Sequence, residues 1–135
     1  MMKEIENRED VSRLVHAFYD KIRADEELGP IFNAHLSAEQ WPPHLEKLTD
    51  FWETNLFGIP KFKGNPPRVH AEVDHKMNYG VTQEHFAHWM RLWFSTIDEL
   101  FEGRLADRAK NAARRMSTGL FLAIWNHRPE NNSQR

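Results

Sequence analysis

The 135-residue sequence predicts a single all-α domain, because apolar residues recur at three- and four-residue spacing and no stretch alternates apolar with polar residues. The first apolar stripe consists of Val11, Leu14, Val15, Phe18, Tyr19 and Ile22. Asn7 is a typical N-cap residue, and the acidic residues Glu9 and Asp10 follow it in the first turn. We therefore expect a helix that begins after Asn7 and ends before Gly29.

Three further helices are expected. One runs from about residue 42 to residue 57, because Pro42 and Pro43 suit a first turn and Gly58 suits a C-terminal cap. Thr82 is expected to cap the next helix, which ends near Gly103, and the last begins near residue 105. Residues 58–81 show no helical period and are rich in Pro and Gly, so they are expected to form an irregular segment. A structureless segment of this length in a compact domain is usually functional.

The composition excludes several classes of protein. With 18 Lys and Arg against 20 Asp and Glu, the net charge of -2 gives no basic surface for nucleic acid or an acidic membrane. The absence of Cys excludes disulfides, thiolate metal sites and covalent haem attachment. The first twenty residues are too charged for a signal peptide or a membrane span. We therefore expect a cytoplasmic protein with neither a nucleic-acid nor a membrane partner.

Aromatic and His residues are unusually frequent, with 9 Phe, 5 Trp, 2 Tyr and 8 His. A lone His in a polar loop, such as His70, is usually a solvated residue, and Tyr19, His44 and Trp89 also have ordinary structural roles when taken singly. In combination, aromatic-rich helices beside a His-bearing segment describe a flat apolar slot with an axial ligand and polar groups opposite it. Non-covalent haem needs this arrangement.

A second hypothesis belongs to another class. His75, His85 and His88 could bind a metal without haem, or the aromatic residues could pack against a protein partner. In this alternative Tyr19 and Trp89 are core residues, and His70 is dispensable.

Six stretches occur in a fixed order: FYDKIR at 18–23, LGPIFN at 28–33, WPPH at 41–44, DFWE at 50–53, GNP at 64–66 running on to His70, and FAHW at 86–89. Together they resemble the group III truncated haemoglobins over residues 11–124. The resemblance implies a shortened globin, with two helices packed over two around haem b. It places the globin domain at residues 1–126 and leaves residues 127–135 as a polar tail expected to be disordered.

The resemblance also implies roles for particular residues. His70 would be the proximal iron ligand, and Tyr19, His44 and Trp89 would be distal hydrogen-bond donors to a diatomic ligand. Residues lining the haem would be Phe32, Leu48, Phe51, Trp52, Phe86 and Trp89. Lys47 and Arg68 are the candidates for contacts with the haem propionates, since carboxylates attract cations.

This sequence departs from the family pattern after His70, where Glu72, Asp74 and His75 make a usually apolar stretch polar and longer. His75 could therefore compete with His70 as the ligand. Because Pro42 and Pro43 precede it, His44 could gate the pocket or ligate iron itself.

The expected function is binding of O2, NO or CO, with redox or oxygen chemistry favoured over bulk oxygen transport. Nitric oxide dioxygenase or peroxidase-like activity would need an external reductant, and hence a reductase partner.

Overall fold

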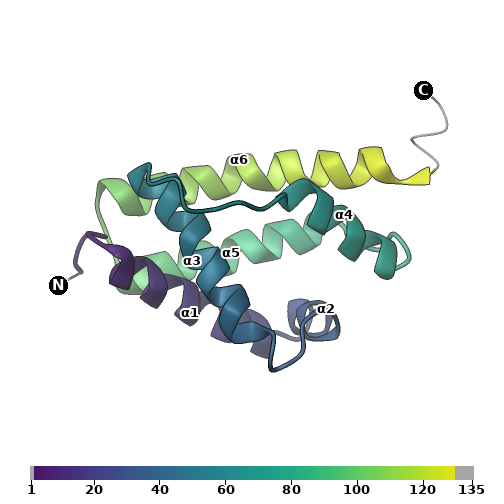
Figure 1. Ribbon diagram of the computed structural model, residues 1–135, viewed down its shortest axis with the longest axis horizontal. Coiled ribbons are helices and arrows are strands. Elements are labelled where there is room, and N and C mark those ends of the chain that lie inside the picture. The colour runs from purple at the N-terminus through teal and green to yellow at the C-terminus, as the bar shows by residue number, and fades with distance from the viewer. Residues whose placement is uncertain (1, 130–135) are drawn as a thin grey trace.

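The computed structural model describes residues 2–129, and within them the chain forms six helices (Figure 1). They are α1 (Arg8–Ala24), α2 (Leu28–His35), α3 (Trp41–Phe57), α4 (Pro66–Lys76), α5 (Gln83–Leu100) and α6 (Arg104–His127). Helix α1 packs against α3 and α5, and α6 packs against α4 and α5. The predicted all-α class is confirmed. No helix within residues 2–129 is both long enough and apolar enough to span a bilayer.

The ends of three helices agree with the predicted caps. The Asn7 side chain accepts a hydrogen bond from the backbone N–H of Asp10 at 3.0 Å, as an N-cap should. Gly58 ends α3 in the left-handed region at φ 71°, which Gly adopts without strain. Thr82 caps α5 by accepting from the N–H of His85 at 3.2 Å. Each of these helices has one end where expected because local chemistry specifies that end.

Aromatic rings join the helices in the core. Trp52 of α3 is 2% exposed and stacks on Trp93 of α5 with ring centroids 4.5 Å apart. The indole N–H of Trp93 donates to the carbonyl of Ala109 at 3.1 Å, which ties α5 to α6. The ring of Phe18 meets that of Trp93 edge-on at 4.9 Å, and so joins α1 to the same core.

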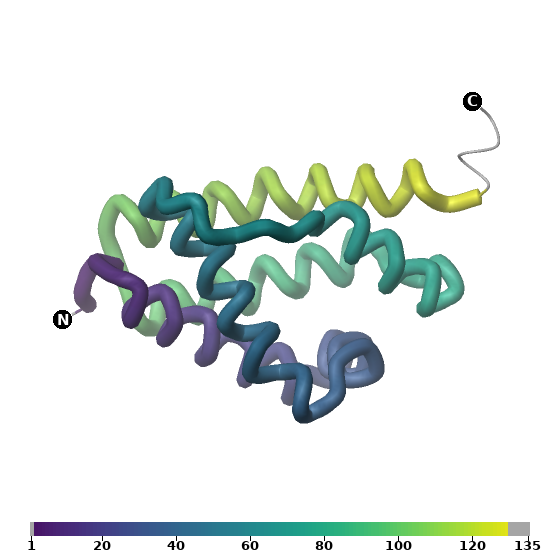
Figure 2. The backbone as a smooth tube through the Cα atoms, in the orientation of Figure 1, coloured from purple at the N-terminus to yellow at the C-terminus, as the bar shows by residue number. Residues whose placement is uncertain are grey.

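The prediction that residues 58–81 are irregular is wrong for residues 66–76, which form α4. Asn65 caps this helix by accepting from the N–H of Arg68 at 3.2 Å, and Pro66 and Pro67 occupy its first turn, where no N–H is needed. The helix lacks an apolar stripe because Asp74, one turn after His70, is its buried residue. Residues 58–65 and 77–82 are the non-helical parts of this region, and Figure 2 shows the first of them connecting α3 to α4.

The predicted polar tail begins inside the folded structure. Residue 127 ends α6, and the Arg128 guanidinium binds the carboxylate of Asp74 through Nε and Nη2, both at 3.0 Å. Arg128 also donates to the carbonyl of Val81 at 2.6 Å. Disorder was therefore the wrong prediction for Arg128, which closes the connection between α4 and α5. The rest of the expected disordered tail, residues 130–135, lies outside the described residues.

A buried carboxylate predicts how stability depends on pH. The Glu53 carboxylate accepts a hydrogen bond from the Arg8 guanidinium at 2.7 Å. It also forms a salt bridge with the Lys61 ammonium at 3.0 Å. Burial alone would raise the pKa of Glu53, but these cations outweigh burial and hold the pKa below its ordinary value of 4.5. The unfolded chain therefore takes up this proton first as the pH falls, so the stabilisation present above pH 4.5 is lost in acid.

We expect the free energy of unfolding of Glu53→Gln to fall less than that of the wild type between about pH 5 and pH 3. Denaturant unfolding at a series of pH values measures this difference. Glu46→Gln is the control, because Glu46 pairs with the same Arg8 but its side chain is 66% exposed. Parallel pH profiles for Glu53→Gln and the wild type would contradict the assignment.

Candidate functional site

His70 lies on α4 in a geometry that suits a metal ligand. Its Nδ1 is 2.7 Å from the carbonyl oxygen of Pro66. A carbonyl only accepts, so Nδ1 must carry the proton, and the lone pair is on Nε2. Nε2 makes no hydrogen bond to any described residue. Burial lowers the pKa of His70, so the ring stays neutral at neutral pH.

Aromatic side chains flank His70. The ring of Phe86, on α5, lies nearly parallel to the imidazole with centroids 6.2 Å apart. Phe121 of α6 meets Phe86 edge-on at 6.0 Å. The surroundings of His70 on this side are therefore apolar and aromatic.

Tyr19 and Trp89 are brought together from α1 and α5. Burial is the largest influence on Tyr19 and raises the pKa of its hydroxyl, while a hydrogen bond with the Trp89 side chain acts in the opposite direction. The phenol is thus neutral and keeps a proton to donate. Phe18 supports both rings, with centroid distances of 4.7 Å to Tyr19 and 5.3 Å to Trp89.

His44 lies in the first turn of α3 and is half-buried. Its ring meets Trp41 edge-on at 5.8 Å, and Trp41 lies 5.9 Å from the ring of Tyr19. Burial, followed by the charges of Lys47 and His35, lowers the pKa of His44. A neutral imidazole therefore joins Tyr19 and Trp89 on the same aromatic cluster.

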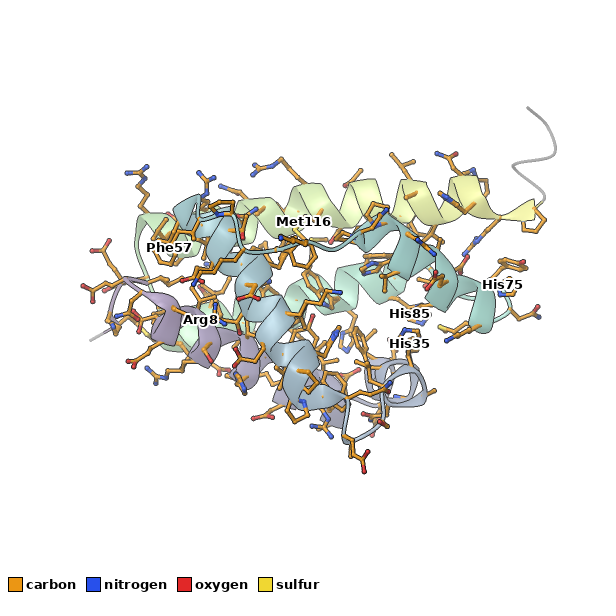
Figure 3. All side chains as sticks on the ribbon, viewed as in Figure 1. Arg8, His35, Phe57, His75, His85 and Met116 are labelled. Carbon is orange, nitrogen blue, oxygen red and sulfur yellow. The ribbon has the colours of Figure 1, made fainter. Side chains whose placement is uncertain are left out.

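His35 connects the two groups of residues. It lies at the C-terminal end of α2, where Figure 3 shows its side chain on the side of α2 that faces α4 and α5. Burial lowers the pKa of His35, as it lowers that of His44 and of His70. A positive charge on His35 would lower the pKa of both other imidazoles further.

The predicted lining residues divide into two groups. The first group is half-buried and consists of Phe32, Leu48, Phe51, Phe86 and Trp89. Trp52 is instead buried against Trp93 in the core. Half-buried apolar side chains on inward-facing helix surfaces are the lining that a large apolar ligand needs.

The two predicted propionate contacts differ in their surroundings. Lys47 is exposed on α3, one turn after His44. Arg68 is paired with Glu72 at 3.3 Å and shares a groove with His75, Lys76 and His127. Residues two apart on a helix point to nearly opposite sides, so Arg68 and His70 lie on different faces of α4, and the propionate contact of Arg68 stays a prediction.

The alternative metal site does not form within the described residues. His85 accepts from the backbone N–H of Thr82 at 3.0 Å, and His88 binds the Asp25 carboxylate at 2.7 Å. His75 is exposed and lies at the far end of α4 in Figure 3. Across residues 2–129, no three His, Asp or Glu side chains are placed to hold one metal ion. The exposure of His75 also favours His70 as the ligand on α4.

Comparison with known proteins identifies the family. The chain is 32% identical over 103 residues to the group 3 truncated hemoglobin ctb of Campylobacter jejuni, a match covering 75% of this chain and 77% of that protein. The chain belongs to the group 3 truncated haemoglobins. A crystal structure of group III truncated hemoglobin from Campylobacter jejuni superposes with a TM-score of 0.80 at 27% identity, covering 92% of this chain and 95% of that one. The sequence matches no family model. The predicted shortened globin fold is thereby confirmed.

Membership of a globin family implies haem binding in general, and the residues of this truncated haemoglobin fit that group. The neutral His70 offers a free Nε2, which is the imidazole atom suited to iron, and its other nitrogen is fixed by Pro66. The aromatic ring of Phe86 lies beside it, and Trp41 and Trp89 lie close to Tyr19. The sequence contains no Cys, so attachment would be non-covalent.

Sequence reasoning gave no individual role to Trp41, His35 or the Asp74–Arg128 pair of this truncated haemoglobin. Trp41 is 2% exposed, and its Nε1 has no hydrogen-bond partner among the described residues. Its position beside His44 in the WPPH stretch was the available signal. Asp74 and Arg128 are 54 residues apart, so their pairing has no local signal.

Proposed function

We propose that this truncated haemoglobin binds haem b through Nε2 of His70 and binds O2, NO or CO beside Tyr19, His44 and Trp89. The observation that carries the proposal is the 2.7 Å hydrogen bond from His70 Nδ1 to the Pro66 carbonyl. It fixes the tautomer and orients a neutral ring with its lone pair on Nε2. When bound, the haem would supply an iron centre that takes a diatomic ligand and exchanges electrons.

The chain's own contribution is to exclude water and to donate hydrogen bonds. Tyr19 is 5% exposed, so its hydroxyl acts in a water-poor environment where hydrogen bonds are stronger. Trp89 is fixed by its contact with Phe18 at 5.3 Å and supplies an N–H donor. The half-buried His44, near the start of α3, provides a third polar group beside Trp41 and Tyr19.

These donors favour redox or oxygen chemistry over bulk transport, because they would retain a polar ligand that a carrier must release easily. Such chemistry would require an external reductant, and we propose a reductase partner for that reason. Lys47 and Arg68 remain the predicted propionate contacts, and the cytoplasmic location remains a prediction.

Tyr19→Phe tests the proposed role of the hydroxyl. Loss of one hydrogen bond to bound ligand is expected to speed O2 dissociation about tenfold. Stopped-flow measurement on the haem-loaded protein gives this rate. Tyr79→Phe is the matched control, because Tyr79 is the other tyrosine and its ring packs against the exposed His75 at 5.5 Å. Equal rates for Tyr19→Phe and the wild type would contradict the proposal.

A further inference from the structure

Trp41 presents a buried donor that has no acceptor among the described residues. Among residues 2–129, four buried side-chain polar atoms lack a hydrogen-bond partner, and Trp41 Nε1 belongs to the most buried of these residues, at 2% exposure. An indole N–H can only donate. Buried donors are almost always satisfied, and Trp93 illustrates this with its 3.1 Å bond to Ala109. The missing partner of Trp41 therefore needs an explanation.

The surroundings of Trp41 are those of the proposed ligand pocket. Its ring lies 5.9 Å from Tyr19, 6.4 Å from Phe32 and 5.8 Å from His44. The Arg23 guanidinium lies 4.8 Å from the ring centroid and covers one face. Phe32 and Arg23 offer no side-chain acceptor for an N–H group, and neither Tyr19 nor His44 bonds the Trp41 N–H within the described residues. The acceptor is then best supplied by a small molecule bound among these residues.

We infer that Trp41 is a further donor of the distal pocket, whose indole N–H hydrogen-bonds the diatomic ligand that Tyr19 and Trp89 also contact. The inference rests on the proposed function. It explains why a buried indole N–H is left without a protein partner next to two of the proposed ligand-stabilising residues, Tyr19 and His44. It also makes Trp41 a residue that controls ligand retention.

Trp41→Phe tests this role, because it keeps an aromatic ring and removes the N–H. In the haem-loaded protein we expect O2 to dissociate about threefold to tenfold faster. We also expect the C–O stretching frequency of the CO complex to rise, since a donor near the ligand has been lost. Trp125→Phe is the matched control, because Trp125 lies 47% exposed on α6. It should leave both values unchanged.

Two further measurements distinguish a hydrogen bond from Trp41 to the ligand from a general structural effect of the substitution. In ¹⁵N-labelled wild type, the indole signal that disappears in Trp41→Phe should shift when CO binds. Trp41→Leu, a second variant without the N–H, should raise the CO frequency in the same direction. The inference would be overturned if the indole signal did not shift on CO binding and the CO frequency did not change in the variants. This holds even if Trp41→Phe were less stable than the wild type.

The outcomes separate this inference from the proposed function. Normal haem uptake with an unchanged CO frequency in both Trp41 variants would overturn the role of Trp41 alone, and would indicate that its N–H binds water instead. Failure of the wild type to take up haem would overturn the proposed function and this inference together.

Discussion

His70→Gly is expected to weaken haem binding by at least about 100-fold, because loss of a group that only orients a metal ligand already weakens binding by 10- to 100-fold. Removal of the imidazole removes Nε2, the ring nitrogen that keeps its lone pair because Nδ1 carries the proton bonded to the Pro66 carbonyl. The helices should survive, because His70 is half-buried and lies outside the hydrophobic core. Titration with haemin, followed through the Soret absorbance, measures the change, and circular dichroism checks the helix content.

Two comparisons make this result specific. Added imidazole should restore a five-coordinate ferrous spectrum to His70→Gly, because it can occupy the space left by the side chain. His75→Gly is the matched control, since it removes an exposed imidazole from the same helix. Loss of haem in His75→Gly, with normal uptake by His70→Gly, would show that the ligand had been assigned to the wrong residue.

Asp74→Ala is expected to lower the free energy of unfolding by about 3–5 kcal/mol, the usual effect of removing one partner of a buried ion pair. Asp74 is 1% exposed and receives two bonds from Arg128, both at 3.0 Å, and one from the Val81 N–H at 3.1 Å. The substitution would leave a guanidinium that is 17% exposed without its carboxylate. Denaturant unfolding measures the effect.

Glu72→Ala is the control for Asp74→Ala, because Glu72 lies on the same helix and its exposed pairing with Arg68 should contribute less than about 1 kcal/mol. A double-mutant cycle with Arg128→Gln would isolate the coupling between Asp74 and Arg128. Asp74→Ala and Glu72→Ala with equal stability would show that the pair does not stabilise the connection between α4 and α5.

The sequence predicted those helices whose ends and buried faces are both specified locally. Helix α1 has its Asn7 cap and an apolar stripe, and α5 has its Thr82 cap and a row of aromatic residues. Helix α4 was missed because the residue that it buries is a carboxylate, Asp74. Hydrophobic periodicity cannot detect a helix whose inward face is polar.

In the candidate site too, features specified by neighbouring residues differ from features that depend on distant segments. The ligand role of His70 was assigned through the resemblance that includes the GNP stretch before it, and its bond to Pro66, which spans only four residues, is a local feature of α4. Arg68 was predicted to contact a propionate from its nearness in sequence to His70, and in the structure its side chain bonds Glu72 one turn further along α4. The partner of Arg128 and the surroundings of Trp41 depend on segments distant in the sequence, so they required the folded structure.

The central claim is that one haem is held at His70, and titration of the haem-free wild type with haemin tests it most directly. We expect a Soret band that saturates at one haem per chain and shifts when the reduced protein meets CO. Absorbance that rises without saturation and does not respond to CO would contradict specific haem binding, and would leave this chain as a globin fold without the proposed function.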